Sequence, residues 1–378
     1  MPLLFCPKEI RPPDPRVALT PETARKFREM GIACAVEEGA GRAASYPDAE
    51  YEAAGCAVMS VRAEGLARAD VVVGIHPLTI EDIRRLRPGV ITAGFLDPFR
   101  QQETVAALAA AGITAISLEL VPRTTTAQKM DALSSQASLA GYAAVLLAAM
   151  RLDKILPMMM TPAGTLQPSR ILIVGVGVAG LQAIATAKRL GARVTAFDTR
   201  PVVEEQVRSL GARFLKLDLG ETGQTEQGYA KELTPQQIEL QRQGMAKACA
   251  ESDVVITTAQ VFGKPAPRLI TSEMLAGMRS GSVVVDMAVN TGGNVEGSRP
   301  DEEVVLGGVR VLGAGNLAAT VPHHASLAFA SNIFNLLAHF WSGEAGFSCS
   351  PDDEIGRSAI LCRNGKVVNE RFAPPAKN

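Results

Sequence analysis

The feature that most constrains the fold is an apolar, mostly β-branched run, ILIV at 171–174, that leads directly into three glycines. Gly175, Gly177 and Gly180 have the spacing G-x-G-x-x-G, and the segment LQAIATAKRLGA after them has a helical pattern. A second strand pattern follows and ends at Asp198. Strand, tight turn, helix and strand in this order predict a βαβ unit of a parallel sheet.

The same glycines indicate a ligand. Gly175 permits the tight turn, Gly177 lets the backbone approach a pyrophosphate, and Gly180 allows the helix to pack closely, with its N-terminal N–H groups toward the ligand. Asp198 is placed to accept hydrogen bonds from both ribose hydroxyls and to repel a 2′-phosphate. The motif therefore predicts a dinucleotide site that favours NAD over NADP. Arg200 weakens this preference, because an arginine can accommodate the phosphate.

Strand and helix patterns alternate along most of the chain. In the first lobe, strand patterns lie at 33–37, 57–59, 70–75, 90–93 and 114–117, and helical patterns lie at 21–30, 48–54, 80–86 and 102–111. A second set starts at Arg170 and continues through DVVITTA, SVVVDMA and VRVLGA. This alternation predicts an α/β protein with two doubly wound, Rossmann-like parallel-sheet domains joined by long helices. We expect residues 1–134 and 322–378 to form the first domain, and residues 135–321 to form the NAD-binding domain.

The composition argues against several classes of function. The 38 basic and 39 acidic residues are scattered along the chain and leave a net charge of -1, so nothing attracts nucleic acid. The six cysteines show no metal-ligand spacing, and we expect reduced, mostly buried thiols. His323 and His324 are adjacent, so their side chains diverge and no metal site is expected. The N-terminus lacks the apolar run of a signal peptide, which favours a cytoplasmic location.

Two stretches, 132–150 and 311–343, contain no Asp, Glu, Lys or Arg. Both carry polar side chains, such as Gln136 in the first and Asn332 in the second, that would cost roughly several kcal/mol each if they faced lipid. We therefore expect buried or lobe-bridging helices, the second of which returns the chain to the first lobe. A membrane role would need other chains.

Eight segments in order resemble one protein family over nearly the full length: RTTTAQKMDALSSQASLAGY, GVGVAGLQAIATAKRLGA, AFDTRP, GYAKELTP, TTAQVFGKPAP, DMAVNTGGN, GAGNLAATVPHHAS and DDEIGRSAI. The family is the NAD(H)-binding alpha subunit, domain I, of proton-translocating NAD(P)+ transhydrogenase. The resemblance implies direct hydride transfer between NADH bound here and NADP+ bound on a partner subunit, coupled to proton translocation by membrane subunits. It further implies a homodimer, cytoplasmic and peripheral to the inner membrane through those partners.

The segment 123–134 carries the most specific part of the resemblance, which implies that Arg123, Gln128 and Asp131 surround the nicotinamide and that Ser134 is a further contact. A cation, an amide and a carboxylate can orient a carboxamide and a ribose without acid–base chemistry, which suits transfer between two aligned rings. A plain ion pair between Arg123 and Asp131 at a helix start is the structural alternative. The resemblance implies further dinucleotide contacts at Thr124, Thr125, Lys129, Met130, Val176, Val178, Thr199, Arg200, Gly228, Tyr229, Gln241 and Gln260.

Alanine dehydrogenase shares several of these segments and is the main alternative. In that enzyme a lysine and a histidine belong to the catalytic machinery, and their places correspond to Gly74 and Asp97 here. Without them amino acid oxidation lacks its acid and base. His76 lies close to the place of the lysine and keeps this alternative open. A third hypothesis is a non-catalytic NAD-binding module that reports the redox state to a partner, which the segment 123–134 opposes.

Overall fold

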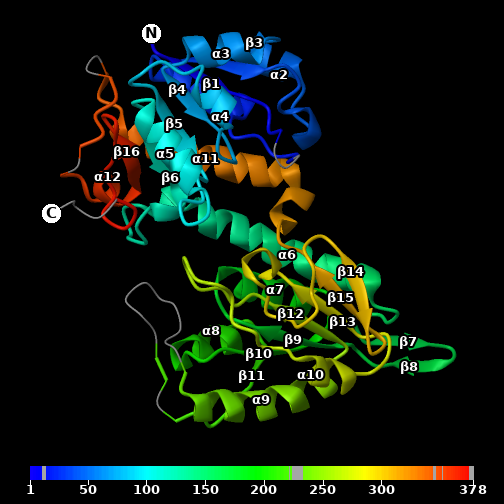
Figure 1. The fold of residues 1–378 in the computed structure, drawn as a ribbon. Helices are drawn as coiled ribbons and strands as arrows, with labels where there is room; N and C mark the ends of the chain where they lie inside the picture. Colours follow the sequence, from blue (N-terminus) through cyan, green and yellow to red (C-terminus); the bar gives the residue numbers. More distant parts are fainter. Residues whose placement is uncertain (11–13, 221, 224–232, 344–345, 351, 374–378) are drawn as a thin grey trace. The chain divides into compact units, whose positions relative to one another are not determined.

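Two β-sheets with helices packed against them organise the chain (Figure 1). The computed structural model describes residues 1–10, 14–220, 222–223, 233–343, 346–350 and 352–373. By its internal contacts the chain divides into a first unit, Met1–Gln136 with Val321–Asn378, and a second unit, Ala137–Thr320. The predicted α/β class with Rossmann-like sheets is confirmed.

The sheet of the first unit has the strand order β17-β16-β6-β5-β4-β1-β2-β3. Its strands are β1 (Leu3–Cys6), β2 (Ala33–Glu37), β3 (Ala57–Met59), β4 (Val71–Val73), β5 (Ile91–Gly94), β6 (Thr114–Ser117), β16 (Ile360–Arg363) and β17 (Lys366–Val367). Its helices are α1 (Pro21–Glu29), α2 (Asp48–Ala53), α3 (Arg62–Arg68), α4 (Ile80–Ile83), α5 (Gln102–Ala110), α11 (Pro322–Phe340) and α12 (Glu354–Ala359). The last residues of the chain thus complete the first sheet, where β16 lies beside β6 (Figure 1).

The larger sheet of the second unit has the order β11-β10-β9-β12-β13-β15-β14. Its strands are β9 (Arg170–Val174), β10 (Arg193–Phe197), β11 (Arg213–Phe214), β12 (Val254–Thr257), β13 (Val283–Asp286), β14 (Glu303–Leu306) and β15 (Val309–Gly313). The helices of this unit are α7 (Val178–Arg189), α8 (Glu204–Ser209), α9 (Pro235–Ala250) and α10 (Ser272–Ala276). A long helix, α6 (Ala132–Arg151), begins in the first unit and ends in the second.

Central strands are apolar at every position because both faces of the sheet are covered. On β9, Ile171 and Ile173 pack into one hydrophobic core, whereas Leu172 and Val174 pack into a second core on the opposite face. The strands β12 and β13 alternate between the same two cores. This burial on two sides is why the run ILIV is continuous rather than alternating, as is typical of parallel sheets.

Helix starts follow local capping chemistry. Thr20 and Thr23 form a reciprocal capping box at α1, and Pro21 stands at the first helical position, where no N–H partner is needed. Thr234 and Gln237 form the same arrangement at α9. These residues satisfy N–H groups that a helix leaves without an intrahelical partner.

The sheets differ from the predicted purely parallel form at their edges. β14 runs antiparallel to β15, and β16 runs antiparallel to both β6 and β17. The turn of one hairpin consists of Gly307 and Gly308, and the other of Asn364 and Gly365, all with positive φ. Two residues of positive φ match the right-handed twist of flanking strands, so these turns favour hairpins.

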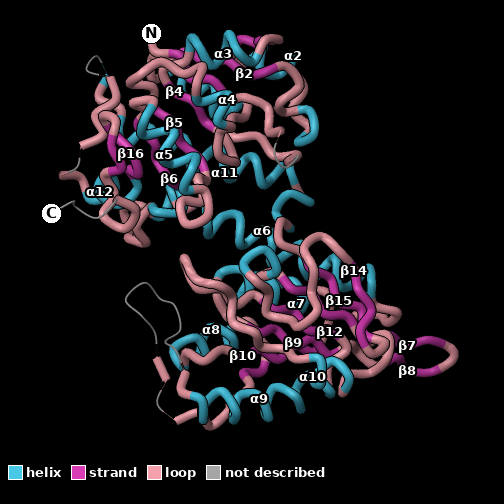
Figure 2. Tube along the Cα trace, viewed as in Figure 1, coloured by secondary structure: helices cyan, strands magenta, loops and turns pink. Residues whose placement is uncertain are grey.

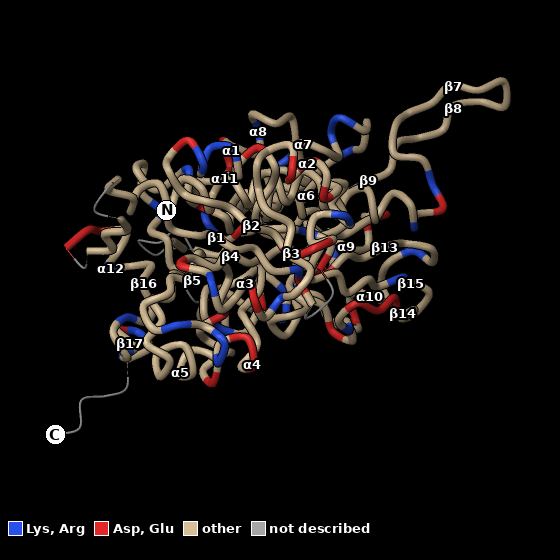
Figure 3. The backbone as a smooth tube through the Cα atoms, turned by 90° about the horizontal axis from the view of Figure 1, so that it is seen from above, with Lys and Arg blue, Asp and Glu red and all other residues tan. Residues whose placement is uncertain are grey.

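A second departure from the predicted alternation of strands and helices lies in the segment 157–169, before β9. Its central part forms a two-stranded hairpin, β7 (Met159–Thr161) and β8 (Gly164–Leu166), that extends away from the second unit (Figure 2). Its apolar side chains are exposed, with exposed fractions of 83% for Met160 and 47% for Leu166. Figure 3 shows that the hairpin itself carries no charged residue, whereas acidic and basic residues are scattered over the other elements.

Among the described residues, α6 is long and apolar enough to cross a membrane by length and composition, with a mean hydropathy of 1.4 over its most apolar window. Its polar side chains have partners within the protein. Gln136 is bonded to the buried Arg16 and to the carbonyl of Ala325, and the Ser135 hydroxyl donates to Asn332. These bonds within the first unit are typical of a helix packed in protein.

Candidate functional site

The glycine turn after β9 has the geometry that its spacing predicts. Gly175 has φ of 96°, which L side chains rarely adopt, and its carbonyl oxygen accepts a bond from the Thr258 hydroxyl (3.0 Å). A Cβ on Gly180 would lie 2.0 Å from that same carbonyl oxygen, so only glycine lets α7 start this close to the turn. A Cβ on Gly177 would meet nothing within 4 Å, which leaves open space beside the turn.

This open space lies where the order of the second sheet reverses. The chain continues from β9 outward to β10 and β11, then returns to β12 on the other side of β9. Ligands of open α/β sheets bind at such a point, outside the carboxyl ends of the strands. Val178 is 42% exposed at the first turn of α7, and Gln260 follows β12 and is exposed. The N-terminus of α7 also directs backbone N–H groups and a positive dipole end toward this place.

Asp198 follows β10 directly and is joined to the glycine turn. Its Oδ2 accepts the backbone N–H of Val176 (2.8 Å) and Nη2 of Arg200 (2.8 Å). Its Oδ1 accepts the backbone N–H (2.9 Å) and Nε (2.9 Å) of Arg200. The hydrogen bonds that Arg200 donates to the Asp198 carboxylate raise the pKa of Arg200, against the opposing effect of burial. A carboxylate therefore stands beside the turn, at the position that recognises a ribose in dinucleotide-binding folds.

The other predicted contacts of the second unit are less closely grouped. Val176 is buried in the turn, and the carbonyl of Thr199 accepts the Thr222 hydroxyl (2.6 Å). Gln241 is buried on α9. Within the part of the chain that the structure describes, no hydrogen bond joins Gln241 to the glycine turn. Gly228 and Tyr229 lie outside the described residues.

In the first unit, the segment 123–134 leads into α6 through a short 3-10 turn, Gln128–Met130. The Asp131 carboxylate accepts the Ser134 N–H at Oδ1 (2.8 Å) and the Ser134 hydroxyl at Oδ2 (2.6 Å), as a helix cap does. The side chains of this segment fall into three groups by their accessible surface. Those of Arg123, Thr125, Gln128 and Lys129 are exposed, Thr124, Asp131 and Ser134 are half-buried, and Met130 is buried. The three polar residues expected around a nicotinamide thus all have surface that a ligand can reach.

Sequence reasoning missed the residue that holds this turn. Asn332 on α11 is buried, donates from Nδ2 to the Lys129 carbonyl (2.9 Å) and accepts the Ser135 hydroxyl (2.7 Å). It therefore connects the 3-10 turn to the first turn of α6. The sequence does show a polar residue, Asn332, within a helix that lacks charged residues. It does not show the partner of Asn332, because Lys129 lies 203 positions earlier in the chain.

We expect Asn332→Ala to lower the free energy of unfolding of the first unit by about 1–3 kcal/mol, because the Lys129 carbonyl and the Ser135 hydroxyl lose a buried partner. Trp341, the only tryptophan, packs beside Phe347 against the core of this unit, so its fluorescence in urea measures the loss. The matched control is Asn335→Ala, whose bond to the same carbonyl is longer (3.4 Å). Equal losses in both variants would contradict a specific role of Asn332.

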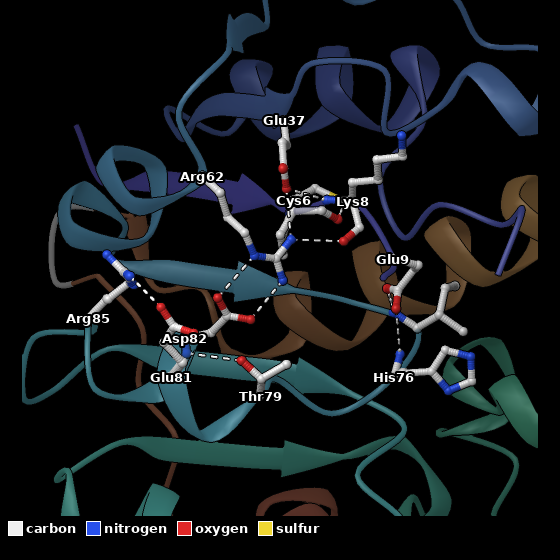
Figure 4. A network of polar contacts seen from close by, with 12 residues as sticks. Cys6, Lys8, Glu9, Glu37, Arg62, His76, Thr79, Glu81, Asp82 and Arg85 are labelled. Atoms are coloured by element: carbon white, nitrogen blue, oxygen red, sulfur yellow. Dashed lines mark hydrogen bonds and ion pairs between the residues drawn. The ribbon is translucent and has the colours of Figure 1, made fainter. Parts of the chain in front are cut away.

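The switch point of the first sheet, at the carboxyl ends of β1 and β4, contains side chains in place of a glycine turn (Figure 4). The Glu9 carboxylate accepts two backbone N–H groups there, one of them from His76 (3.3 Å). Arg62 is held between Glu37 (2.7 Å) and Asp82 (2.8 Å). These backbone N–H groups already have an acceptor, so the place does not resemble the glycine turn of the second unit.

A buried charge network lies beside it. The fully buried Asp14 side chain accepts Nε (2.9 Å) and Nη2 (2.6 Å) of Arg16 and lies 2.8 Å from His76 Nε2. Burial raises the pKa of Asp14, but the hydrogen bonds from Arg16 and His76 outweigh burial and hold this pKa well below its usual range. Burial also raises the pKa of Glu9, although His76 partly opposes the shift.

No group of three or more His, Cys, Asp or Glu side chains in the described portion of the chain is arranged to hold a metal ion. The six cysteines are buried and unpaired by disulfides. Burial raises the pKa of the Cys249 thiol to about 12, which makes a reactive thiolate unfavourable. The arrangement that remains is a glycine turn, a helix N-terminus and the Asp198 carboxylate beside the turn. Together they define a dinucleotide-binding α/β protein.

Comparison with known proteins refines this class. Two family models match: alanine dehydrogenase/PNT, N-terminal domain, over residues 5–140, and its C-terminal domain over residues 144–370. The first portion of NAD(P) transhydrogenase subunit alpha from Rickettsia prowazekii is 42% identical over 358 residues, which are 94% of this chain and 93% of that protein. The crystal structure of transhydrogenase from Sinorhizobium meliloti has a TM-score of 0.86 and 41% identity, and the match covers 98% of this chain and 100% of that one.

A solved L-alanine dehydrogenase, 24% identical, matches with a TM-score of 0.81 over 98% of each chain, which shows the shared fold alone. The chain belongs to the alanine dehydrogenase/PNT family, and within it to the alpha subunits of NAD(P) transhydrogenase. The predicted family is thereby confirmed.

Proposed function

We propose that this chain binds NAD(H) in its second unit and that it transfers hydride directly to or from NADP(H) held by a partner subunit. The observation that carries the proposal is the glycine turn joined to the Asp198 carboxylate, in a chain whose relatives are named transhydrogenase subunits. The glycine turn fits a pyrophosphate because Gly177 leaves open space beside it. The dihydronicotinamide ring supplies the hydride when NADH is bound.

The residues of the segment 123–134 position the reacting ring in this proposal. Arg123 and Gln128 offer exposed donors for the carboxamide and the ribose, while Asp131, fixed by Ser134, offers an acceptor. None of them needs to gain or lose a proton for hydride to pass, so their contribution is orientation and exclusion of water. The proposed function therefore needs a fixed carboxylate at the start of α6 rather than an acid–base pair.

The first unit favours this function over amino acid oxidation. Gly74 has no side chain to polarise a keto group. A Cβ there would already lie 3.3 Å from Glu9 Oε1. Asp97, at the place of the histidine, has φ of 44° and pairs with Arg100 (2.8 Å). His76, close to the place of the lysine, is the residue that keeps the alternative open, and its Nε2 lies 2.8 Å from Asp14 Oδ2.

The proposal includes partners. The relatives are named as the first portion of subunit alpha, which supports an assembly with an NADP(H)-binding subunit and a membrane-spanning subunit that couples transfer to proton translocation. This chain would then lie on the cytoplasmic side of the inner membrane, attached through those subunits. The exposed methionines of the β7–β8 hairpin support a homodimer, because an apolar arm of this kind is stabilised when a second copy covers it.

The test is a mixture of the purified chain with an NADP(H)-binding transhydrogenase component, in which reduction of an NAD analogue by NADPH is followed. Transfer only in the mixture supports the proposal. Turnover of NADH with pyruvate and ammonia by this chain alone would show an amino acid dehydrogenase instead. If the chain binds nucleotide but neither assay shows turnover, the result favours the third hypothesis, a module that reports the redox state to a partner.

We expect Asp131→Asn to lower the rate of hydride transfer in that mixture at least about tenfold, while the dissociation constant for NADH changes less than about threefold. Asparagine caps helices as well as aspartate does, so α6 keeps its start, while the charge is lost and the amide NH2 can only donate to the Ser134 hydroxyl. Stopped-flow transfer and NADH titration measure the two quantities. Equal losses of transfer and binding would contradict a role in positioning and would favour the redox-reporting module.

A further inference from the structure

The ribose-binding carboxylate of the second unit is already fully occupied by its own chain. Asp198 accepts four hydrogen bonds, two at each oxygen, from the backbone of Val176 and from the backbone and side chain of Arg200. A carboxylate offers about four acceptor positions. The two ribose hydroxyls of a dinucleotide therefore find no free position on Asp198 in this arrangement.

Two of the four bonds are made by a side chain that can move. Nε and Nη2 of Arg200 each bond one oxygen of Asp198, and the two side chains are 14% and 8% exposed. The backbone donors of Val176 and Arg200 belong to the turn and stay in place. Two positions open when the guanidinium leaves, one on each oxygen, and two hydroxyls of a ribose can take them.

The same guanidinium also contacts the glycine turn, since Nη2 donates to the carbonyl of Val176 (3.1 Å). When displaced, it remains tethered two residues from Asp198, next to the 2′ position of the ribose. An arginine at this place accommodates a 2′-phosphate. In the closed pair, moreover, it neutralises the charge that would repel such a phosphate.

We infer that Arg200 is an internal competitor for the ribose-binding carboxylate and that its displacement sets the discrimination between NAD(H) and NADP(H). The arginine lowers the affinity for NADH, because its two bonds to Asp198 must be exchanged for ribose hydroxyls. The arginine raises the affinity for NADPH, because it neutralises the negative charge of Asp198 and offers a cation to the 2′-phosphate. This inference rests on the proposed function, in that it concerns the nucleotide that the second unit binds.

The experiment measures the dissociation constants of NADH and NADPH for the full chain and its variants by isothermal titration calorimetry. For Arg200→Gln we expect the preference for NADH over NADPH to increase about tenfold. Asp198→Asn should decrease the same preference, because the amide no longer repels the phosphate. Arg200→Lys keeps the charge but cannot bond both oxygens of Asp198 with the fork of a guanidinium, so its preference should lie between those of the wild type and Arg200→Gln.

Arg193→Gln is the matched control, because Arg193 is exposed at the opposite end of β10 and its loss changes the net charge by the same amount. An increase in preference in Arg200→Gln but not in Arg193→Gln supports the inference. An unchanged or smaller preference in Arg200→Gln overturns it, and so does loss of NADH binding in this variant, because the inference expects NADH to bind more tightly without the arginine. If the wild type binds neither nucleotide, the proposed function itself fails.

Discussion

Alanine in place of Gly180 is expected to lower the free energy of unfolding of the second unit by at least about 3 kcal/mol and to abolish dinucleotide binding. Its Cβ would lie 2.0 Å from the carbonyl oxygen of Gly175, so backbone, rather than a flexible side chain, has to move. The movement would separate α7 from β9 and open the core between them. Calorimetric unfolding and titration with NADH measure the two losses.

Gly177→Ala is the control for this substitution. Gly177 has φ of -87° and a Cβ there meets nothing within 4 Å, so alanine fits the backbone without strain. We expect its stability to remain within about 1 kcal/mol of the wild type, while NADH binds less tightly because the Cβ occupies the space of the pyrophosphate. If the Gly180→Ala variant has the same free energy of unfolding as the Gly177→Ala variant, the close approach of α7 to the turn is not required.

Arg16→Met is expected to destabilise the first unit by about 3–5 kcal/mol at neutral pH, because it leaves the Asp14 charge buried without its guanidinium. The side chains of Arg16 and Asp14 are 5% and 0% exposed, and two of their hydrogen bonds would be lost together with the bond to Gln136. Urea unfolding followed by the fluorescence of Trp341 reports on this unit.

The pH dependence gives this prediction a direction. The pKa of Asp14 is depressed in the folded protein, so its stabilisation is complete above the unfolded value of about 4 and is lost as the pH falls toward the folded value. Without Arg16, burial favours the protonated form of Asp14, so the stability deficit of the variant should narrow as the pH falls below the pKa that Asp14 has in the folded variant. A deficit that stays constant with pH would contradict the role of the charge.

Lys26→Met serves as the control, since Lys26 pairs with Glu22 on the surface of α1. Such exposed pairs contribute about 0.3–0.5 kcal/mol. A loss in Lys26→Met as large as that in Arg16→Met would show that removal of the positive charge, and not burial of the pair, causes the effect.

Much of the fold could be predicted because local patterns and tertiary burial agree. The strand patterns at 33–37, 57–59 and 114–117 have the same limits as β2, β3 and β6. The sequence patterns did not reveal β1 or α3. The first is a four-residue strand at the N-terminus, and the second begins at Arg62 after Val61, which provides no side-chain cap. Asn364–Gly365 was a readable hairpin signal, but the pairing of β16 with β6 brings together residues more than 240 positions apart.

The sequence by itself determined the glycine turn, the acidic residue at the end of the following strand and the membership of the family, because each depends on residue types at short, fixed spacing. Only the tertiary structure decided that Arg200 saturates Asp198, that Asn332 holds the turn at Lys129 and that Arg16 is neutralised by Asp14. Spacing restricts where the backbone can go. Which polar groups satisfy one another is decided by distance, burial and orientation, and these exist only once the chain has folded.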